Sequence, residues 1–106
     1  MPKYLILASY TTEGLKGLLK DGGSKRREAV EQTARGLGGR VEAFYFAFGK
    51  NDAVVILDLP SPVSAAAASL AINASGAVTS KTVVLLTPEE MDQAAKQTVQ
   101  YRPPGK

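Results

Sequence analysis

The chain has 106 residues, of which 44% are hydrophobic and 22% charged, and this length and balance are those of one globular domain. It contains no cysteine and no histidine, which excludes disulfides, thiolate metal sites, cysteine nucleophiles and a Ser-His-Asp triad. The net charge is only +3, the basic residues are scattered and no apolar run reaches the roughly 18 residues that span a bilayer, so we expect neither a nucleic-acid nor a membrane partner.

The first forty residues predict one strand followed by two helices. Residues 3–10 form a short apolar run that ends in turn-type residues, as buried strands do. No signal-peptide pattern precedes this run, so the expected location is the cytoplasm. Leucines at helical spacing predict a short helix that Asp21-Gly22-Gly23 ends. Ser24 is the expected N-cap of a second helix, whose apolar stripe is Val30, Thr33, Ala34 and Leu37.

The remainder predicts a hairpin, a helix, a fourth strand and a last helix. Residues 40–48 and 53–59 are strand-like, and the short turn between them makes them an antiparallel pair. Ser61-Pro62 opens an alanine-rich helix, and residues 77–86 carry the fourth strand. Thr87-Pro88-Glu89-Glu90 is a capping box for the last helix, and the paired prolines favour an extended tail over 101–106.

The order of the predicted elements is β-α(α)-β-β-α-β-α, in one domain that covers residues 1–106. A strand–helix–strand unit occurs twice, which is the ferredoxin-like split βαβ arrangement of the α+β class, with a four-stranded antiparallel sheet. The additional elements are the short helix after the first strand and the C-terminal helix.

The sheet is expected to be apolar on both faces, although helices in this arrangement cover only one. In the first strand Leu5 and Leu7 alternate with Ile6 and Ala8, and the other three strands repeat this pattern. A large open apolar face is typical of an interface, so we expect a homodimer or a higher oligomer in which a second copy covers it. The alternative is that the additional helix or the tail folds under the sheet.

The chain contains the segments PKYLILASYTTEGLKGLL, GGRVEAFYFAFG, NASGAV and KTVVLLTPEE, with Arg27 in the second helix and Asp52 before AVVILDLP. Together they resemble the GYD domain family, whose members are small and mostly bacterial proteins. The resemblance extends over nearly the whole chain. It implies the dimeric α+β barrel type, in which two ferredoxin-like sheets pack face to face, and it implies no particular reaction.

The family takes its name from a Gly-Tyr-Asp element at the hairpin turn. Here the turn is Gly49-Lys50-Asn51-Asp52, in which Gly49 and Asp52 match and Asn51 stands in the place of the tyrosine. A chemical role of that tyrosine would be lost. A conformational role would be kept, because asparagine tolerates left-handed backbone angles.

Six residues are candidates for lining a ligand pocket, because each is polar or half-polar within an apolar strand or turn. Asp52 is a candidate base or ligand-binding carboxylate, and its alternative role is to bind backbone N–H groups. By alternation Glu42 shares a face with the phenylalanines of its strand, and Asp58 shares one with Val54 and Ile56. Burial raises a carboxylate's pKa and suits it to proton chemistry, unless the group reaches water at a strand end. The tyrosines are otherwise core residues. The full set is Tyr4, Tyr10, Glu42, Tyr45, Asp52 and Asp58.

The start of the second helix is a candidate anion site formed by Ser24, Lys25 and Arg27. Free N–H groups and the positive end of the helix dipole favour an anion there, although the spacing matches neither a phosphate-binding loop nor a dinucleotide fingerprint. The alternative is an ordinary solvated helix end. No metal site and no cofactor are predicted.

Three functional classes remain open. The first is a small oligomeric binding protein that holds an apolar or aromatic molecule between the sheet and either its partner or its helices. The second is a cofactor-free isomerase or monooxygenase that uses carboxylates and tyrosines. The third is a structural or regulatory assembly protein without a ligand. A pocket separates the first two from the third, and a buried carboxylate beside a tyrosine would favour the second.

Overall fold

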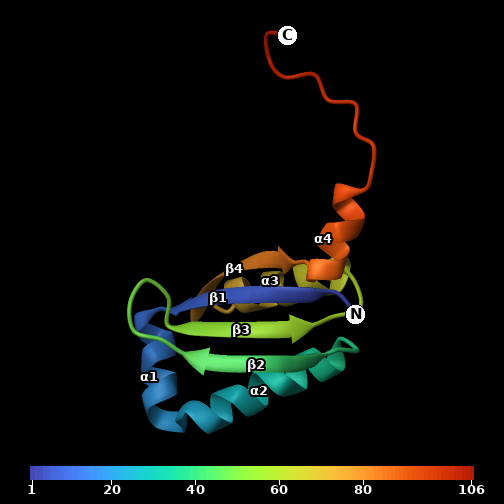
Figure 1. Ribbon diagram of the computed structural model, residues 1–106. Coiled ribbons are helices and arrows are strands. Elements are labelled where there is room, and N and C mark those ends of the chain that lie inside the picture. Colours follow the sequence, from blue (N-terminus) through green and yellow to red (C-terminus); the bar gives the residue numbers. More distant parts are fainter.

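The computed structural model describes all 106 residues and contains four strands and four helices (Figure 1). The strands are β1 (Lys3–Tyr10), β2 (Arg40–Phe46), β3 (Ala53–Asp58) and β4 (Val78–Leu85), and the helices are α1 (Thr12–Asp21), α2 (Gly23–Gly36), α3 (Pro62–Ala74) and α4 (Pro88–Ala95). The strands form one antiparallel sheet in the order β2-β3-β1-β4. This is the ferredoxin-like α+β arrangement that the sequence predicts.

Local capping chemistry sets most of the helix boundaries. The side chains of Thr11 and Ser61 accept backbone hydrogen bonds at the starts of α1 and α3, and α4 begins with the predicted reciprocal capping box. The predicted cap at Ser24 is wrong. The N-cap position is Gly22, two residues earlier, and α2 begins at Gly23; the φ of 83° at Gly22 lies in the region that favours glycine. Helix α1 therefore turns into α2 with a single residue between them.

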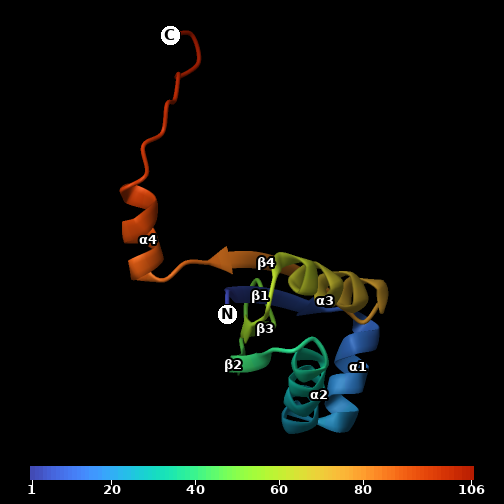
Figure 2. The ribbon, with the colours of Figure 1, turned by 90° about the vertical axis from the view of Figure 1, so that its right-hand side faces the viewer.

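The two faces of the sheet have different surroundings. Figure 2 shows α1, α2 and α3 on one side, which we call the covered face. Alternate residues of β1 and β3 on this face are buried and form most of the core, namely Tyr4, Ile6, Ala8, Ala53, Val55 and Leu57. The other side, the uncovered face, has no helix over it. Its apolar side chains are half-buried or exposed, namely Leu5, Leu7, Val54, Ile56, Val83 and Leu85.

A bulge in β2 changes which residues share a face. The register of β2 against β3 shifts between Val41 and Ala43, so Val41 lies opposite Leu57 and Phe44 lies opposite Val55. Both Val41 and Phe44 therefore point to the covered face. The prediction that Glu42 shares a face with the phenylalanines is wrong, because the extra residue turns its carboxylate to Lys3 on the uncovered face.

Helix α4 and the tail stand away from the rest of the chain. Helix α4 makes no substantial contact with another element, and it lies on the side of the uncovered face, beyond β4 (Figure 2). The radius of gyration is 16.7 Å, whereas a compact chain of this length has about 13 Å. The tail therefore does not fold under the sheet. None of the helices is both long and apolar enough to cross a membrane.

Candidate functional site

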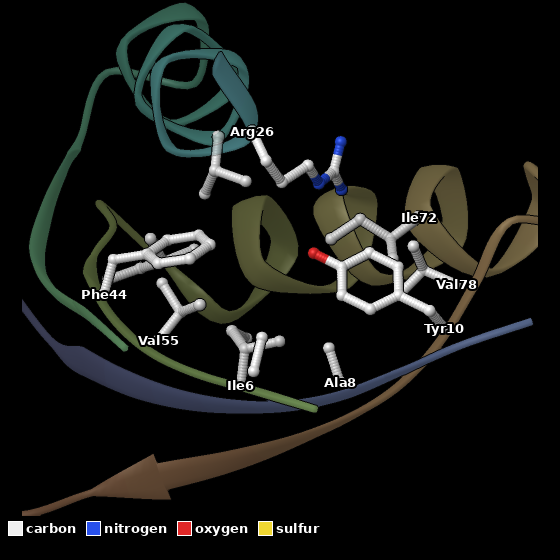
Figure 3. A pocket seen from close by; sticks show the side chains of 11 residues that line it. Ile6, Ala8, Tyr10, Arg26, Phe44, Val55, Ile72 and Val78 are labelled. Atoms are coloured by element: carbon white, nitrogen blue, oxygen red, sulfur yellow. The ribbon is translucent and has the colours of Figure 1, made fainter. Parts of the chain in front are cut away.

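An apolar cavity lies between the covered face and the helices. Helix α2 packs on β2 and α3 packs on β4, which leaves space over the middle of β1 and β3. The cavity has a volume of about 40 Å³, within about 400 Å³ of space that includes open solvent, and ten of its eleven lining residues are hydrophobic. Figure 3 shows Ile6, Ala8 and Val55 from the sheet below it, with Phe44 at one end and Ile72 and Val78 at the other.

Arg26 is the single charged residue of this lining. It is the fourth residue of α2, and its half-buried side chain extends toward Tyr10 and Ile72 at the mouth of the cavity (Figure 3). Arg26 takes part in none of the three ion pairs of the chain. A guanidinium group with free donors therefore borders an apolar space.

The cavity opens into a wider groove between α1, α2 and α3. This groove comprises about 920 Å³ including open solvent and shares Tyr10, Arg26, Ile72 and Val78 with the cavity. Its polar wall includes Glu13 and Asp21 of α1. The backbone of α1 packs close to the start of β4, since a Cβ added at Gly14 would lie 2.0 Å from the carbonyl oxygen of Ala77. Because Glu13, Asp21 and Arg26 all line the groove, the apolar cavity has a charged entrance.

Apart from the cavity, a cluster of charged side chains lies at one end of the uncovered face. It is centred on Asp58, which is 4% exposed. Its carboxylate is 2.8 Å from Lys3 Nζ and 2.8 Å from Arg40 Nη2, and Lys3 Nζ also lies 2.8 Å from Glu42 Oε1. The hydrogen bond from Lys3 lowers the pKa of Asp58, and the same contact raises the pKa of Lys3. Burial does raise the pKa of Asp58, but the hydrogen bond from Lys3 outweighs it, so the expectation of a raised pKa at this residue is wrong. A carboxylate held in its charged form lacks the near-neutral pKa that suits a general base.

The hairpin turn is joined to β1 through Asp52. The carboxylate of Asp52 accepts a hydrogen bond from the backbone N–H of Tyr10 at 2.8 Å, and its own N–H donates to the carbonyl of Ala8 at 2.8 Å. Strand β3 begins at Ala53, so no backbone carbonyl of β3 reaches Tyr10, and the side chain of Asp52 takes that place. The structure gives Asp52 the backbone-binding role that was the alternative to a catalytic one.

A model of one known protein family matches most of the chain. The GYD domain model matches residues 4–95, a span that includes the whole sheet except Lys3, all four helices, Arg26 and Asp52. The chain belongs to the GYD domain family. No match was found among the curated proteins or among the solved structures.

The turn that names the family has one glycine-specific position in this GYD domain. Gly49 has a φ of 148°, whereas no residue other than glycine has a positive φ anywhere in the chain. Asn51 therefore does not use the left-handed angles that asparagine tolerates. It borders a shallow hollow at the edge of the uncovered face with Leu7 and Lys81.

The six predicted pocket residues do not come together at one site in the GYD domain, although Tyr10 and Asp52 border a common hollow beside α1. Tyr10 alone among them lines the cavity, and Tyr4 is 1% exposed in the core. Glu42 and Asp58 are joined through Lys3 on the uncovered face, where Tyr45 is 70% exposed. No group of three or more carboxylates is arranged as metal ligands would be.

The predicted anion residues lie beside Arg26 without including it. Ser24, Lys25 and Arg27 are exposed on the first turns of α2, and Ser24 and Arg27 border a separate hollow that shares only Phe44 with the cavity. Arg26, which is not among the predicted anion residues, lines the cavity instead. Helical periodicity could have identified it, because Arg26 lies one turn before Val30 on the stripe that faces the sheet.

Proposed function

We propose that this GYD domain binds a small apolar or aromatic molecule in the cavity between the sheet, α2 and α3. The observation that carries this proposal is an apolar space over the middle of the sheet, lined by ten hydrophobic residues. Side chains around an unfilled space lose packing contacts, and a ligand of matching shape restores them. Apolar walls with a few polar groups at one end are typical of ligand sites.

The geometry favours binding over proton chemistry. A cofactor-free enzyme of this fold would need a carboxylate or tyrosine able to exchange a proton beside its substrate. Asp58 is paired with two cations, Asp52 binds the backbone of Tyr10, and neither lines the cavity. A binding experiment distinguishes this ligand-binding role from that of an assembly protein that binds no ligand.

The test is a calorimetric titration with small aromatic and aliphatic compounds, preceded by a thermal-shift screen. We expect saturable binding by the natural sequence and its loss in Ala8→Leu, because the larger side chain occupies the cavity from the sheet. Ala66→Leu, on an exposed position of α3, is the matched control and keeps binding. If no compound binds, or if Ala8→Leu binds as well as the natural sequence, the proposal fails.

We also infer that two copies pair through their uncovered faces. Central positions of this face are apolar, and the charges at its end are already paired, which lowers the penalty for enclosing them. Helix α4 extends on the same side and has only eight residues, too few to be stable alone in water. A second copy would supply contacts for both features. Sedimentation equilibrium should give twice the 11.2 kDa of one chain, and a single-chain mass at micromolar concentration would contradict the pairing.

A further inference from the structure

We propose that the ligand of the cavity carries a carboxylate, which Arg26 binds at the mouth beside Tyr10 while the apolar part of the ligand fills the interior. This inference rests on the binding role proposed above and names its chemical class. Its three grounds are the unpaired guanidinium, the neighbouring hydroxyl and the charges of the outer groove.

The guanidinium of Arg26 is the main ground. It is half-buried, lines a cavity whose other ten lining residues are hydrophobic, and has no acidic partner within ion-pair distance. A cation that has lost part of its hydration and has no counter-charge gains strongly from an anion. The planar fork of an arginine matches the two oxygens of a carboxylate, so the pair can form two parallel hydrogen bonds.

Tyr10 supplies a second polar group at the same end. Its hydroxyl points into the space near Arg26 and Ile72 (Figure 3). A phenolic O–H donates readily to a carboxylate oxygen. The backbone N–H of Tyr10 is held by Asp52 at 2.8 Å, so the strand that carries the ring is fixed at this point. The hydroxyl and the guanidinium therefore form a polar end on a site that is otherwise apolar.

The outer groove limits the charge of the ligand. Glu13 and Asp21 line it, so a head group with two negative charges, such as a phosphate, would face repulsion beyond Arg26. A cationic head group would be repelled by Arg26 itself. Lys25 and Arg27 are exposed and do not line the cavity, so they add no charge to its interior. One negative charge on a slim alkyl chain or a single ring fits best.

The experiment compares three probes with one carbon skeleton, namely 4-phenylbutanoate, 4-phenylbutan-1-ol and 4-phenylbutylamine, by isothermal titration calorimetry at neutral pH. We expect the acid to bind at least about tenfold more tightly than the alcohol, since hydrogen bonds to charged groups stabilise by about 1.5 to 3 kcal/mol. The amine should bind most weakly.

Two variants of neighbouring arginines identify the anchor. Arg26→Met keeps an apolar stem and removes the charge, so we expect the acid to lose its preference over the alcohol while the alcohol still binds. Arg27→Met removes the same charge one residue away and should keep the full preference. Arg26→Lys keeps a positive charge but lacks the planar guanidinium that forms two parallel hydrogen bonds, so it should keep part of the preference for the acid over the alcohol. Circular-dichroism melting of each variant checks that it folds.

The outcomes separate this inference from the binding role. If the alcohol binds as tightly as the acid, or the amine more tightly, the carboxylate anchor is overturned while the binding role stands. If Arg27→Met abolishes the preference and Arg26→Met does not, the anchor is assigned to the wrong residue. If none of the three probes binds, both the carboxylate anchor and the proposal that the cavity binds such molecules are overturned.

Discussion

The two faces of the sheet are built from the same strands and yet differ in every respect that matters for function. Ile56 and Leu57 are neighbours in β3, but Leu57 is buried under the helices and Ile56 points to the uncovered face. The covered face has a cavity with one cation at its mouth. The uncovered face is largely apolar, with the paired charges of the Asp58 cluster at one end.

The comparison teaches that hydrophobicity alone does not assign a role to a strand. Both faces carry branched aliphatic side chains, so composition does not distinguish them. What distinguishes them is the pair of helices α2 and α3, which covers one face incompletely and leaves an apolar cavity over the middle of the sheet. We infer that one face serves the ligand and the other serves a second copy, and substitutions at adjacent residues can separate these roles.

The largest expected effect comes from a charge on the uncovered face. In Ile56→Lys each copy would bring an ammonium group into the apolar interface, at several kcal/mol for each buried ion. We expect the dimer to dissociate into single chains in sedimentation equilibrium. Val63→Lys, at a position of α3 that is 78% exposed, is the control and should leave the mass unchanged. A dimer that survives in Ile56→Lys would place the interface elsewhere.

A smaller loss is expected on the covered face, and it appears in folding rather than assembly. Leu57→Ala removes a side chain that is 4% exposed in the core, so we expect the free energy of unfolding in urea to fall by about 2 to 5 kcal/mol. Ile56→Ala, measured at a concentration where the chain is single, should lose clearly less. Equal losses at the two positions would mean that the uncovered face is packed within one chain.

The ion cluster predicts a pH-dependent effect. The pKa of Asp58 is lowered below 3.8, so the stability that its charge contributes is present above pH 3.8 and is lost as the pH falls through the folded-state pKa. We expect Asp58→Asn to lose about 1 to 2 kcal/mol at pH 7, because both cationic partners keep access to water. Urea unfolding should show this difference shrinking toward pH 2.5. A difference that stays constant would mean that the loss comes from packing and not from charge.

The smallest effect is expected where an element makes few contacts. Thr87→Ala removes the capping box of α4 and should weaken that helix by about 1 kcal/mol. Because α4 makes no substantial contact with its own domain, global unfolding of the single chain should change by less than about 0.5 kcal/mol. Ser61→Ala removes the equivalent cap from α3, which packs on β4, and should lower global stability by about 1 kcal/mol. NMR chemical shifts over 88–95 report the local change.

The predictable part of this fold depends on short-range chemistry. Ser61 and Thr87 cap helices as their types and spacing indicate, because the groups that they bind lie within three residues. The strand positions and their antiparallel order follow from apolar runs and turn lengths. The family match over residues 4–95 agrees with the resemblance of the same segments.

The unpredicted part depends on residues that are distant in sequence. The bulge at Val41–Ala43 reverses the face of Glu42, and strict alternation cannot express one extra residue. The pKa of Asp58 falls because Lys3, 55 positions away, lies opposite it in the sheet. The cavity depends on how far apart α2 and α3 settle, which no local pattern determines. Arg26 is the exception, because helical periodicity alone places it on the stripe of α2 that faces the sheet.

The hydrogen bond from Tyr10 to Asp52 also has a consequence for backbone dynamics. The last residue of a strand normally frays, and its amide proton exchanges rapidly with solvent. The Tyr10 N–H instead donates to the carboxylate of Asp52, a residue whose backbone is hydrogen-bonded to Ala8 of β1 and to Ala47, which follows β2. Its proton should therefore exchange as slowly as those in the middle of the sheet. Slow exchange at this position would mean that the acidic residue of the family's turn protects the strand end that carries Tyr10.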